Sequence, residues 1–176
     1  MAIREKDTTI KYMFHTVNDI TPAVVRELGL EAIAFDLDNT TVKDATLTTI
    51  PGAISWIKEL KEAGIKVAIV TNTPHIRAYW FSKTFGVKVN AFSKKPLPHG
   101  IIRMSRKLGV DIHKIGMVGD QVFTDVAAAN RCGAVPILVD PVENKWFWKN
   151  HYKKNRIKEA PIREAFIREH GYYGDK

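Results

Sequence analysis

The sequence predicts a single α/β domain built around a central, mostly parallel β-sheet. Between residues 30 and 141, short apolar segments alternate with segments whose apolar residues recur at helical spacing. This alternation is typical of parallel sheets whose strands are connected by helices. The chain has 176 residues, 45% of them hydrophobic, which is enough for one packed core. We expect a core at 30–141, a helical lead-in at 1–29 and a basic, aromatic tail at 142–176.

The boundaries of the predicted elements follow from residues that favour such positions. Thr21 and Pro22 are typical of an N-cap followed by the first helical residue. Gly64, Gly86 and Gly109 each follow the end of a helical pattern, as C-terminal glycines commonly do. The predicted helices are 22–28, 51–63, 74–85, 98–108 and 124–131, and the predicted strands are 33–36, 65–70, 87–92, 115–118 and 134–139.

Three of the predicted strands end in polar residues that are able to do chemistry. The first strand ends in Asp36, with Asp38 just beyond it; Thr71 and Asn72 follow the second strand, and Asp120 follows the fourth. Because the carboxyl ends of parallel strands lie at one edge of the sheet, where ligands bind, we expect these side chains to converge.

The two aspartates separated by one residue suit phosphate transfer. Asp36 can attack phosphorus and form an aspartyl phosphate, which divides a difficult displacement into two easier ones. Asp38 points to the same side of an extended backbone and can protonate the leaving oxygen, then deprotonate water. Thr71, with the backbone amides of the following helix, can bind phosphate oxygens. The alternatives are a solvated turn for the aspartates and a helix cap for the threonine.

Metal ligands and cations are expected beside these groups. Asp36, Asp120 and Asp125 offer the hard oxygen ligands that Mg²⁺ prefers, and Mg²⁺ commonly keeps waters and binds a substrate phosphate. Lys94 or Lys95 can neutralise the remaining phosphate charge, although either can instead be a solvated surface lysine. The six histidines are scattered, so a zinc site is not expected.

Four segments, in this order, resemble the four motifs of the haloacid dehalogenase-like (HAD) phosphatases. They are Phe-Asp-Leu-Asp-Asn-Thr at 35–40, Val-Thr-Asn-Thr at 70–73, Lys-Lys-Pro at 94–96 and Gly-Asp-Gln-Val-Phe-Thr-Asp at 119–125. The resemblance covers roughly residues 31 to 140. It implies a three-layer, Rossmann-like core and a Mg²⁺-dependent phosphoric monoester hydrolase.

The resemblance also assigns roles to individual residues. Asp36 corresponds to the nucleophile and Asp38 to the general acid and base. Thr71 corresponds to the hydroxyl that orients phosphate, and Lys95, directly before proline, to the phosphate-stabilising lysine. We expect Asn72 to bind substrate together with Thr71 and Lys95.

The same resemblance implies the ligands of the metal. Asp36 and Asp120 are expected to bind Mg²⁺ through their carboxylates, and Asp38 through its backbone carbonyl. Asp125 is expected either to bind the metal directly or to contact one of its ligands.

The intervals between the motifs leave no room for an inserted cap domain. One loop, one helix and one strand fill the interval from Asp38 to Thr71, and a helix and a strand fill that from Thr71 to Lys95. In this family, capless members resemble subclass III, whose open sites suit large substrates or headgroups presented on a surface. Water must then be excluded by the substrate or by a partner.

Within the capless group the chain resembles the YqeG-like branch, which is similar to the mitochondrial phosphatidylglycerophosphate phosphatases. The lead-in at 18–22 supports this likeness, whereas Thr41 and the 93–95 segment depart from the branch pattern. We therefore expect a phosphatidylglycerophosphate-like substrate. The alternatives are a phosphatase of a soluble nucleotide, sugar phosphate or phosphoprotein, and a non-catalytic binding or regulatory protein on this fold.

Charge and the tail bear on location and partners. The net charge of +8 favours anionic partners, and no motif for reading nucleic acid is present. Trp146, Phe147 and Trp148 adjoin a basic cluster, which suits peripheral contact with an anionic membrane; packing of the tail on the core is the alternative. The cluster consists of Lys145, Lys149, Lys153, Lys154, Arg156 and Lys158.

The sequence also predicts a cytoplasmic protein. The N-terminal segment has no apolar stretch of the kind found in signal peptides, and no apolar run is long enough to span a bilayer. Cys132 is the only cysteine, which fits a reducing compartment.

Overall fold

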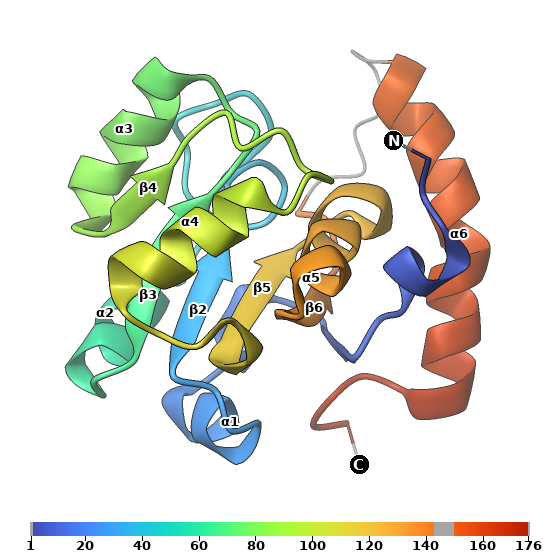
Figure 1. Cartoon of the computed structure of the whole chain (residues 1–176), viewed down its shortest axis with the longest axis horizontal. Helices are drawn as coiled ribbons and strands as arrows, with labels where there is room; N and C mark the ends of the chain where they lie inside the picture. The colour runs from blue at the N-terminus through green and yellow to red at the C-terminus, as the bar shows by residue number, and fades with distance from the viewer. Residues whose placement is uncertain (1, 143–149, 176) are drawn as a thin grey trace.

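The protein is built on a six-stranded sheet in which all pairs of neighbouring strands are parallel. The computed structural model describes residues 2–142 and 150–175, and Figure 1 shows the strands pointing their carboxyl ends toward one edge. The strand order is β1-β6-β5-β2-β3-β4. The predicted α/β fold with a parallel sheet is confirmed. The strands are β1 (Tyr12–Phe14), β2 (Ala32–Phe35), β3 (Lys66–Val70), β4 (Lys88–Asn90), β5 (Ile115–Gly119) and β6 (Val135–Val139).

Helices cover both faces of the sheet, which explains why its central strands are apolar throughout. Ile33 and Phe35 of β2 pack in a cluster with residues of α2 and α3, whereas Ala32 and Ala34 pack in a cluster with residues of α4 and α5. In Figure 1, α4 and α5 lie in front of the strands. The helices are α1 (Pro22–Glu27), α2 (Ala53–Glu62), α3 (His75–Phe85), α4 (His99–Leu108), α5 (Ala127–Cys132) and α6 (Asn150–His170).

The predicted absence of a cap domain is also confirmed. Only loops and α2 connect β2 to β3, and only a short loop and α3 connect β3 to β4. In the described segments between β2 and β4, no inserted domain covers the carboxyl edge of the sheet.

The sequence predicts a helical lead-in at 1–29, but the structure shows that this segment is only partly helical. It contains β1, which forms one edge of the sheet and pairs with β6 so that Phe14 lies opposite Val139. Met13 and Phe14 are each 1% exposed, so this strand belongs to the packed core. With three residues among charged neighbours, it has too little periodicity to be recognised without its partner. The assignment of the whole chain to one domain stays a prediction.

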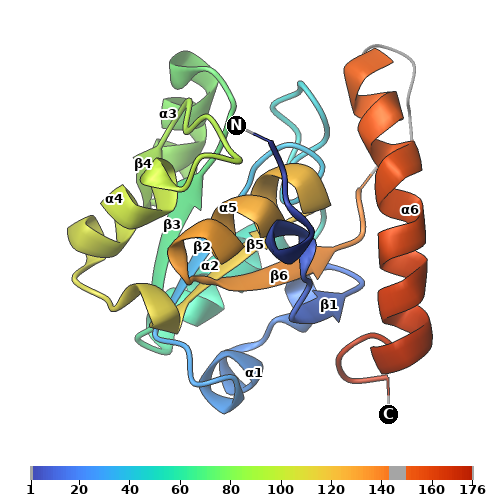
Figure 2. The same ribbon diagram turned by 45° about the vertical axis from the view of Figure 1, so that its right-hand side comes forward.

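The C-terminal segment forms one long helix along the sheet edge. Helix α6 has 21 residues and continues through Pro161, which has no N–H to bind the carbonyl of Ile157. Ile162, Phe166 and Ile167 pack against Met13 and other buried side chains, and Figure 2 shows α6 standing beside β1 and β6. The described part of the tail therefore packs on the core, while Trp146, Phe147 and Trp148 lie outside the described residues.

None of the helices in the described ranges is both long and apolar enough to cross a membrane.

Residues after α6 bind back to β1. The amide of Tyr173 donates to the carbonyl of Met13 at 2.8 Å. His15 lies 3.0 Å from an Asp175 oxygen and 3.5 Å from an Asp140 oxygen, and its ring stacks on that of Tyr172. These contacts attach the C-terminal residues to the end of the edge strand.

This attachment is expected to depend on pH. The Asp175 hydrogen bond, with Asp140, raises the pKa of His15 above 6.5. A raised pKa means that the stabilisation is complete below the ordinary pKa and is lost as the pH rises through the folded-state value. Thermal melting should therefore show a larger advantage of the wild type over His15→Gln at pH 5.5 than at pH 8.5. An advantage independent of pH would contradict this role. The effect is small because His15 is half exposed.

Candidate active site

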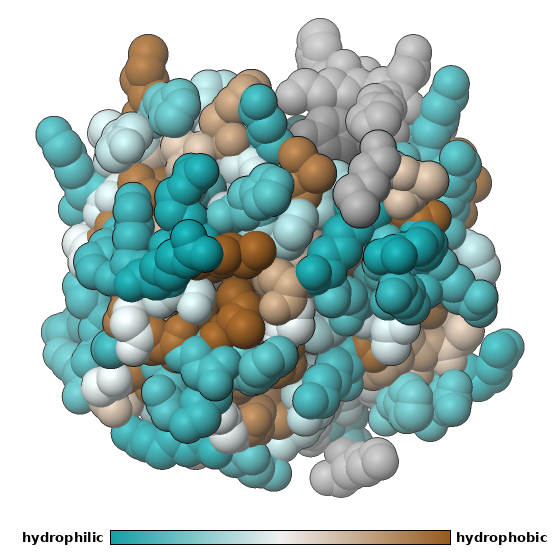
Figure 3. Space-filling model, viewed as in Figure 1, coloured by the Kyte–Doolittle hydropathy of each residue, from teal (hydrophilic) through white to brown (hydrophobic). Residues whose placement is uncertain are grey.

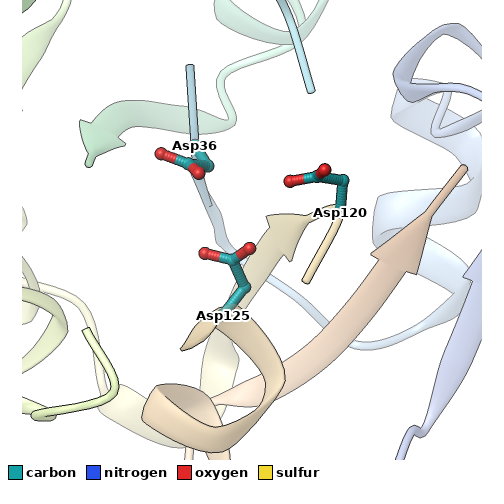
Figure 4. A group of neighbouring side chains, drawn as sticks. All are labelled: Asp36, Asp120 and Asp125. Carbon is teal, nitrogen blue, oxygen red and sulfur yellow. The ribbon is translucent and has the colours of Figure 1, made fainter. Parts of the chain in front are cut away.

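Three aspartates from distant parts of the chain meet at the carboxyl edge of the sheet. Asp36 directly follows β2, Asp120 directly follows β5, and Asp125 lies in the next turn. One oxygen from each carboxylate lies within 4.8 Å of the other two, and Figure 4 shows the three groups facing a common space. Strands β2 and β5 are neighbours in the sheet, which brings the first two together. The three carboxylates can hold a divalent cation.

A π-helical turn and a glycine bring Asp125 into this cluster. Residues Val122–Val126 form the turn, a geometry found often at functional sites. A Cβ at Gly119 would lie 2.2 Å from Cγ of Asp125, so any other residue there would displace the carboxylate. The backbone amide of Gln121 donates to Asp125 at 3.1 Å. The loop thus fixes the third carboxylate.

Lys95 supplies a buried positive charge to the same cluster. Its Nζ lies 3.0 Å from Asp36 Oδ1 and 2.6 Å from Asp125 Oδ1, and it donates to the carbonyl of Val70 at 2.8 Å. Burial alone lowers the pKa of Lys95, but Asp125 and Asp36 raise it on balance, so the ammonium stays charged. Lys94 is exposed; of the two candidates, Lys95 reaches the cluster.

Asn72 and Thr71 organise the loops around Lys95. The Asn72 side-chain oxygen accepts from the backbone amide of Lys95 at 2.8 Å and from the Ser93 hydroxyl at 3.0 Å. The Asn72 amide donates to the carbonyl of Lys95 at 3.0 Å. Thr71 is 1% exposed and donates to the Thr73 hydroxyl at 2.9 Å. The end of β3 therefore holds the lysine-bearing loop in place.

The side chain of Asp38 stands apart from the three clustered carboxylates. It accepts from the Thr73 hydroxyl at 2.6 Å and from the Ala45 amide at 3.0 Å. It also forms an ion pair with Arg77, whose Nε donates to the Thr46 carbonyl at 2.9 Å. Sequence reasoning missed Arg77; its position in the first turn of α3, just after the Val-Thr-Asn-Thr segment, is the signal that was available.

Burial makes negative charge costly in this cluster. Desolvation, reinforced by the Asp125 charge and opposed by Lys95, raises the pKa of Asp36 to about 6. Desolvation also raises the pKa of Asp120, although the Arg156 charge acts to lower it. The pKa of Asp125 is raised in the same way, with Lys95 acting to lower it. Three buried carboxylates around one lysine therefore favour the binding of a further cation.

Helix α6 contributes arginines that the sequence had assigned to the basic tail. Arg156 donates to the carboxylate and the backbone carbonyl of Asp120, and its side chain is only 14% exposed. Arg163 also donates to the Asp120 carbonyl, and to that of Val139 at 3.2 Å. Glu159 is fully buried and accepts from the Phe123 amide at 3.1 Å. One end of α6 is thereby attached to the site.

An open pocket of about 640 Å³ lies over the cluster. Asp36 and Lys95 lie in its wall, and two residues of α6, Asn155 and Lys158, form another part of its lining. All the residues expected to act on substrate line this pocket, namely Asp36, Asp38, Thr71, Asn72 and Lys95.

Comparison with known sequences identifies the family. The pattern described as haloacid dehalogenase-like hydrolase matches residues 42–133. The probable phosphatase YqeG of Bacillus subtilis (strain 168) is 37% identical over 136 residues, which are 77% of this chain and 77% of that protein. The chain belongs to the haloacid dehalogenase-like hydrolases. The expected family and enzyme class are confirmed, and this hydrolase has a YqeG phosphatase as a homologue.

More distant relatives agree with the family and the fold. Phosphatidylglycerophosphate phosphatase 1 of Arabidopsis thaliana is 24% identical over 128 residues, which are 68% of this hydrolase and 37% of that protein. The cobalt-bound deoxy-D-mannose-octulosonate 8-phosphate phosphatase of Haemophilus influenzae superposes with a TM-score of 0.54 at 15% identity. That match covers 80% of this hydrolase and 93% of the other chain, and it shows a shared fold.

Proposed function

We propose that this hydrolase is a Mg²⁺-dependent phosphomonoesterase that forms an aspartyl phosphate on Asp36 and acts on a phosphorylated lipid headgroup of the phosphatidylglycerophosphate type. The observation that carries the proposal is the buried grouping of Asp36, Lys95 and two further carboxylates beneath an open pocket. This grouping joins a nucleophile to the charges that phosphate transfer requires.

The residues of the cluster fit Mg²⁺. Its donors are carboxylate oxygens, which this hard cation prefers. Among the described residues, no aligned hydrogen-bond donor reaches the buried atoms Asp36 Oδ1 and Asp125 Oδ1; Lys95 contacts both as an ion pair. Asp36, Asp120 and the backbone carbonyl of Asp38 would hold the ion, with Asp125 as a further ligand or as a partner of one. When bound, Mg²⁺ supplies positive charge to the phosphate oxygens and the attacking carboxylate.

The protein's own groups account for the two chemical steps. An oxygen of Asp36 forms the bond to phosphorus while the bond to the leaving oxygen breaks, and Asp38 gives that oxygen a proton. Asp38 then takes a proton from the water that attacks the aspartyl phosphate, and inorganic phosphate leaves. Lys95 and Thr71 hold the phosphate oxygens during both steps.

Three observations support a substrate presented on a surface. The pocket is open, and no domain is inserted over it in the segments between β2 and β4. The relative from Arabidopsis is named a phosphatidylglycerophosphate phosphatase. A lipid substrate requires peripheral contact with the surface of an anionic membrane, and the cytoplasmic location expected from the sequence would make this the inner face.

A soluble phosphomonoester is the second candidate substrate. The glyceraldehyde 3-phosphate phosphatase of Methanopyrus kandleri is 28% identical over 108 residues, or 55% of this chain and 46% of that protein. A non-catalytic role on this fold is disfavoured, because the buried grouping of charges is costly to maintain without a function.

The test is phosphate release from phosphatidylglycerophosphate in vesicles, compared with soluble phosphomonoesters, with and without Mg²⁺. We expect Mg²⁺-dependent release that is at least about tenfold faster for the lipid, since the lipid provides additional binding contacts. Faster release from a soluble ester would favour the second candidate. No release from any substrate would contradict the enzymatic proposal.

A further inference from the structure

Five large apolar side chains are exposed on three segments that follow the strand ends near the pocket. We call them the apolar rim: Leu47, Ile76, Tyr79, Trp80 and Phe92. Ile76 is 91% exposed, and the other four are between 44% and 54% exposed. They come from the β2–α2 loop, from α3 and from the β4–α4 loop. Large apolar side chains that gather from separate segments on a surface commonly mark an interaction site.

The apolar rim adjoins the mouth of the pocket. Ile76 lies in the chain between Pro74 and Arg77, which both line the pocket. Leu47 follows Thr46, whose carbonyl accepts a hydrogen bond from the same arginine. Figure 3, in the orientation of Figure 1, shows a hydrophobic side chain projecting from the molecule at the end where α3 begins.

Phe92 connects the third segment to this surface. Its ring centroid lies 6.3 Å from that of His75, the first residue of α3. The His75 ring in turn stacks on that of Tyr79. The His75 ring therefore connects two rim side chains, Tyr79 of α3 and Phe92 of the β4–α4 loop.

Folding alone does not account for the apolar outer face of α3. This helix buries Ala78, Phe81 and Phe85 against the core. Its exposed side carries Ile76 and, about one turn further on, the adjacent residues Tyr79 and Trp80. A surface helix normally presents a polar outer face. The second apolar face is therefore available to a partner.

The charges around the apolar rim favour an anionic partner. The sequence contains no aspartate or glutamate between Glu62 and Asp111, so α3, β4 and α4 carry cations without acidic residues. Lys83 and Lys94 are exposed there, and Lys94 Nζ lies 5.8 Å from the Phe92 ring centroid. Asp44, in the β2–α2 loop, is a carboxylate at the pocket itself.

We propose that the apolar rim docks this protein on an anionic lipid bilayer, with the mouth of the pocket facing the headgroups. The inference rests on the proposed lipid substrate. It adds the protein surface that binds the membrane in which that substrate lies. Tyrosine and tryptophan prefer the boundary between headgroups and acyl chains, and lysines beside them bind anionic lipids. With the rim inserted, a headgroup phosphate reaches Asp36 without leaving the membrane surface.

Vesicle flotation tests the docking independently of catalysis. The wild-type protein should float with vesicles of equimolar phosphatidylglycerol and phosphatidylcholine and much less with phosphatidylcholine alone. The double variant Ile76→Ser, Phe92→Ser should bind the anionic vesicles about tenfold more weakly or worse, because two inserted apolar side chains are lost. The matched control is Ile54→Ser, at an exposed isoleucine in the groove between α2 and the far end of α3, which should bind as the wild type does.

Activity separates this inference from the proposed function. The double variant should lose turnover of vesicle-borne substrate but keep the wild-type rate on a soluble phosphomonoester. Docking is overturned if the wild type does not float with anionic vesicles, or if the double variant binds them as strongly as the wild type does. It is also overturned if the rim instead forms a dimer that the double variant dissolves in sedimentation experiments. Vesicle binding without phosphate release from any substrate would uphold the docking and refute the proposed function.

Discussion

Asp36→Asn is expected to lower phosphate release by on the order of 10³-fold or more, because the amide cannot form the aspartyl phosphate and because loss of a covalent nucleophile has effects of this size. The fold should be retained. Burial raises the pKa of Asp36 to about 6, so at neutral pH its ionised form is costly, and a neutral side chain removes that cost. The melting temperature without added metal should equal or exceed that of the wild type.

The matched control is Asp44→Asn, which removes a different carboxylate from the pocket wall, one that lies outside the acidic cluster. It should keep phosphate release within a few fold of the wild type. Both variants are compared by phosphate release and by thermal melting in the same buffer. Near-wild-type turnover by Asp36→Asn would exclude the covalent mechanism.

Arg156→Ala is expected to destabilise the protein by on the order of 3 kcal/mol, because it leaves the carboxylate of Asp120 buried without its arginine. Asp120 is fully buried, and Arg156 also contacts Glu159 at 3.2 Å. Loss of these Arg156 contacts should also weaken the attachment of α6 to the site. Because Arg156 and a divalent cation neutralise the same carboxylate, added Mg²⁺ should raise the melting temperature of this variant more than that of the wild type.

Two further variants make this prediction specific. Arg168→Ala removes an exposed arginine from the last turn of the same helix and should leave the melting temperature nearly unchanged. Arg156→Lys keeps the charge but cannot donate two hydrogen bonds from a planar guanidinium. Its melting temperature should therefore fall between those of the wild type and the alanine variant. An alanine variant that melts like the wild type would show that α6 is held by its apolar contacts alone.

The central strands and their terminal residues could be predicted because the signals are local. Residues 33–35 are apolar and end at Asp36, so strand β2 and the position of its carboxylate follow from a few neighbouring residues. Edge strand β1 could not be predicted in this way, because its three residues are stabilised by pairing with β6. Continuation of α6 through Pro161 was likewise decided by packing on the core rather than by helix propensity.

The site shows the same division. The sequence by itself determined which acidic residues end the strands, and parallel topology then placed Asp36 and Asp120 at one edge. The residue pattern alone left Lys94 and Lys95 open and the family resemblance selected Lys95, which does contact Asp36 and Asp125. Only the tertiary structure decided that Arg156, at the end of the tail's basic cluster, contacts Asp120. These outcomes depend on burial and on contacts between residues far apart in the chain, where a side chain's charge is balanced by groups that no local pattern identifies.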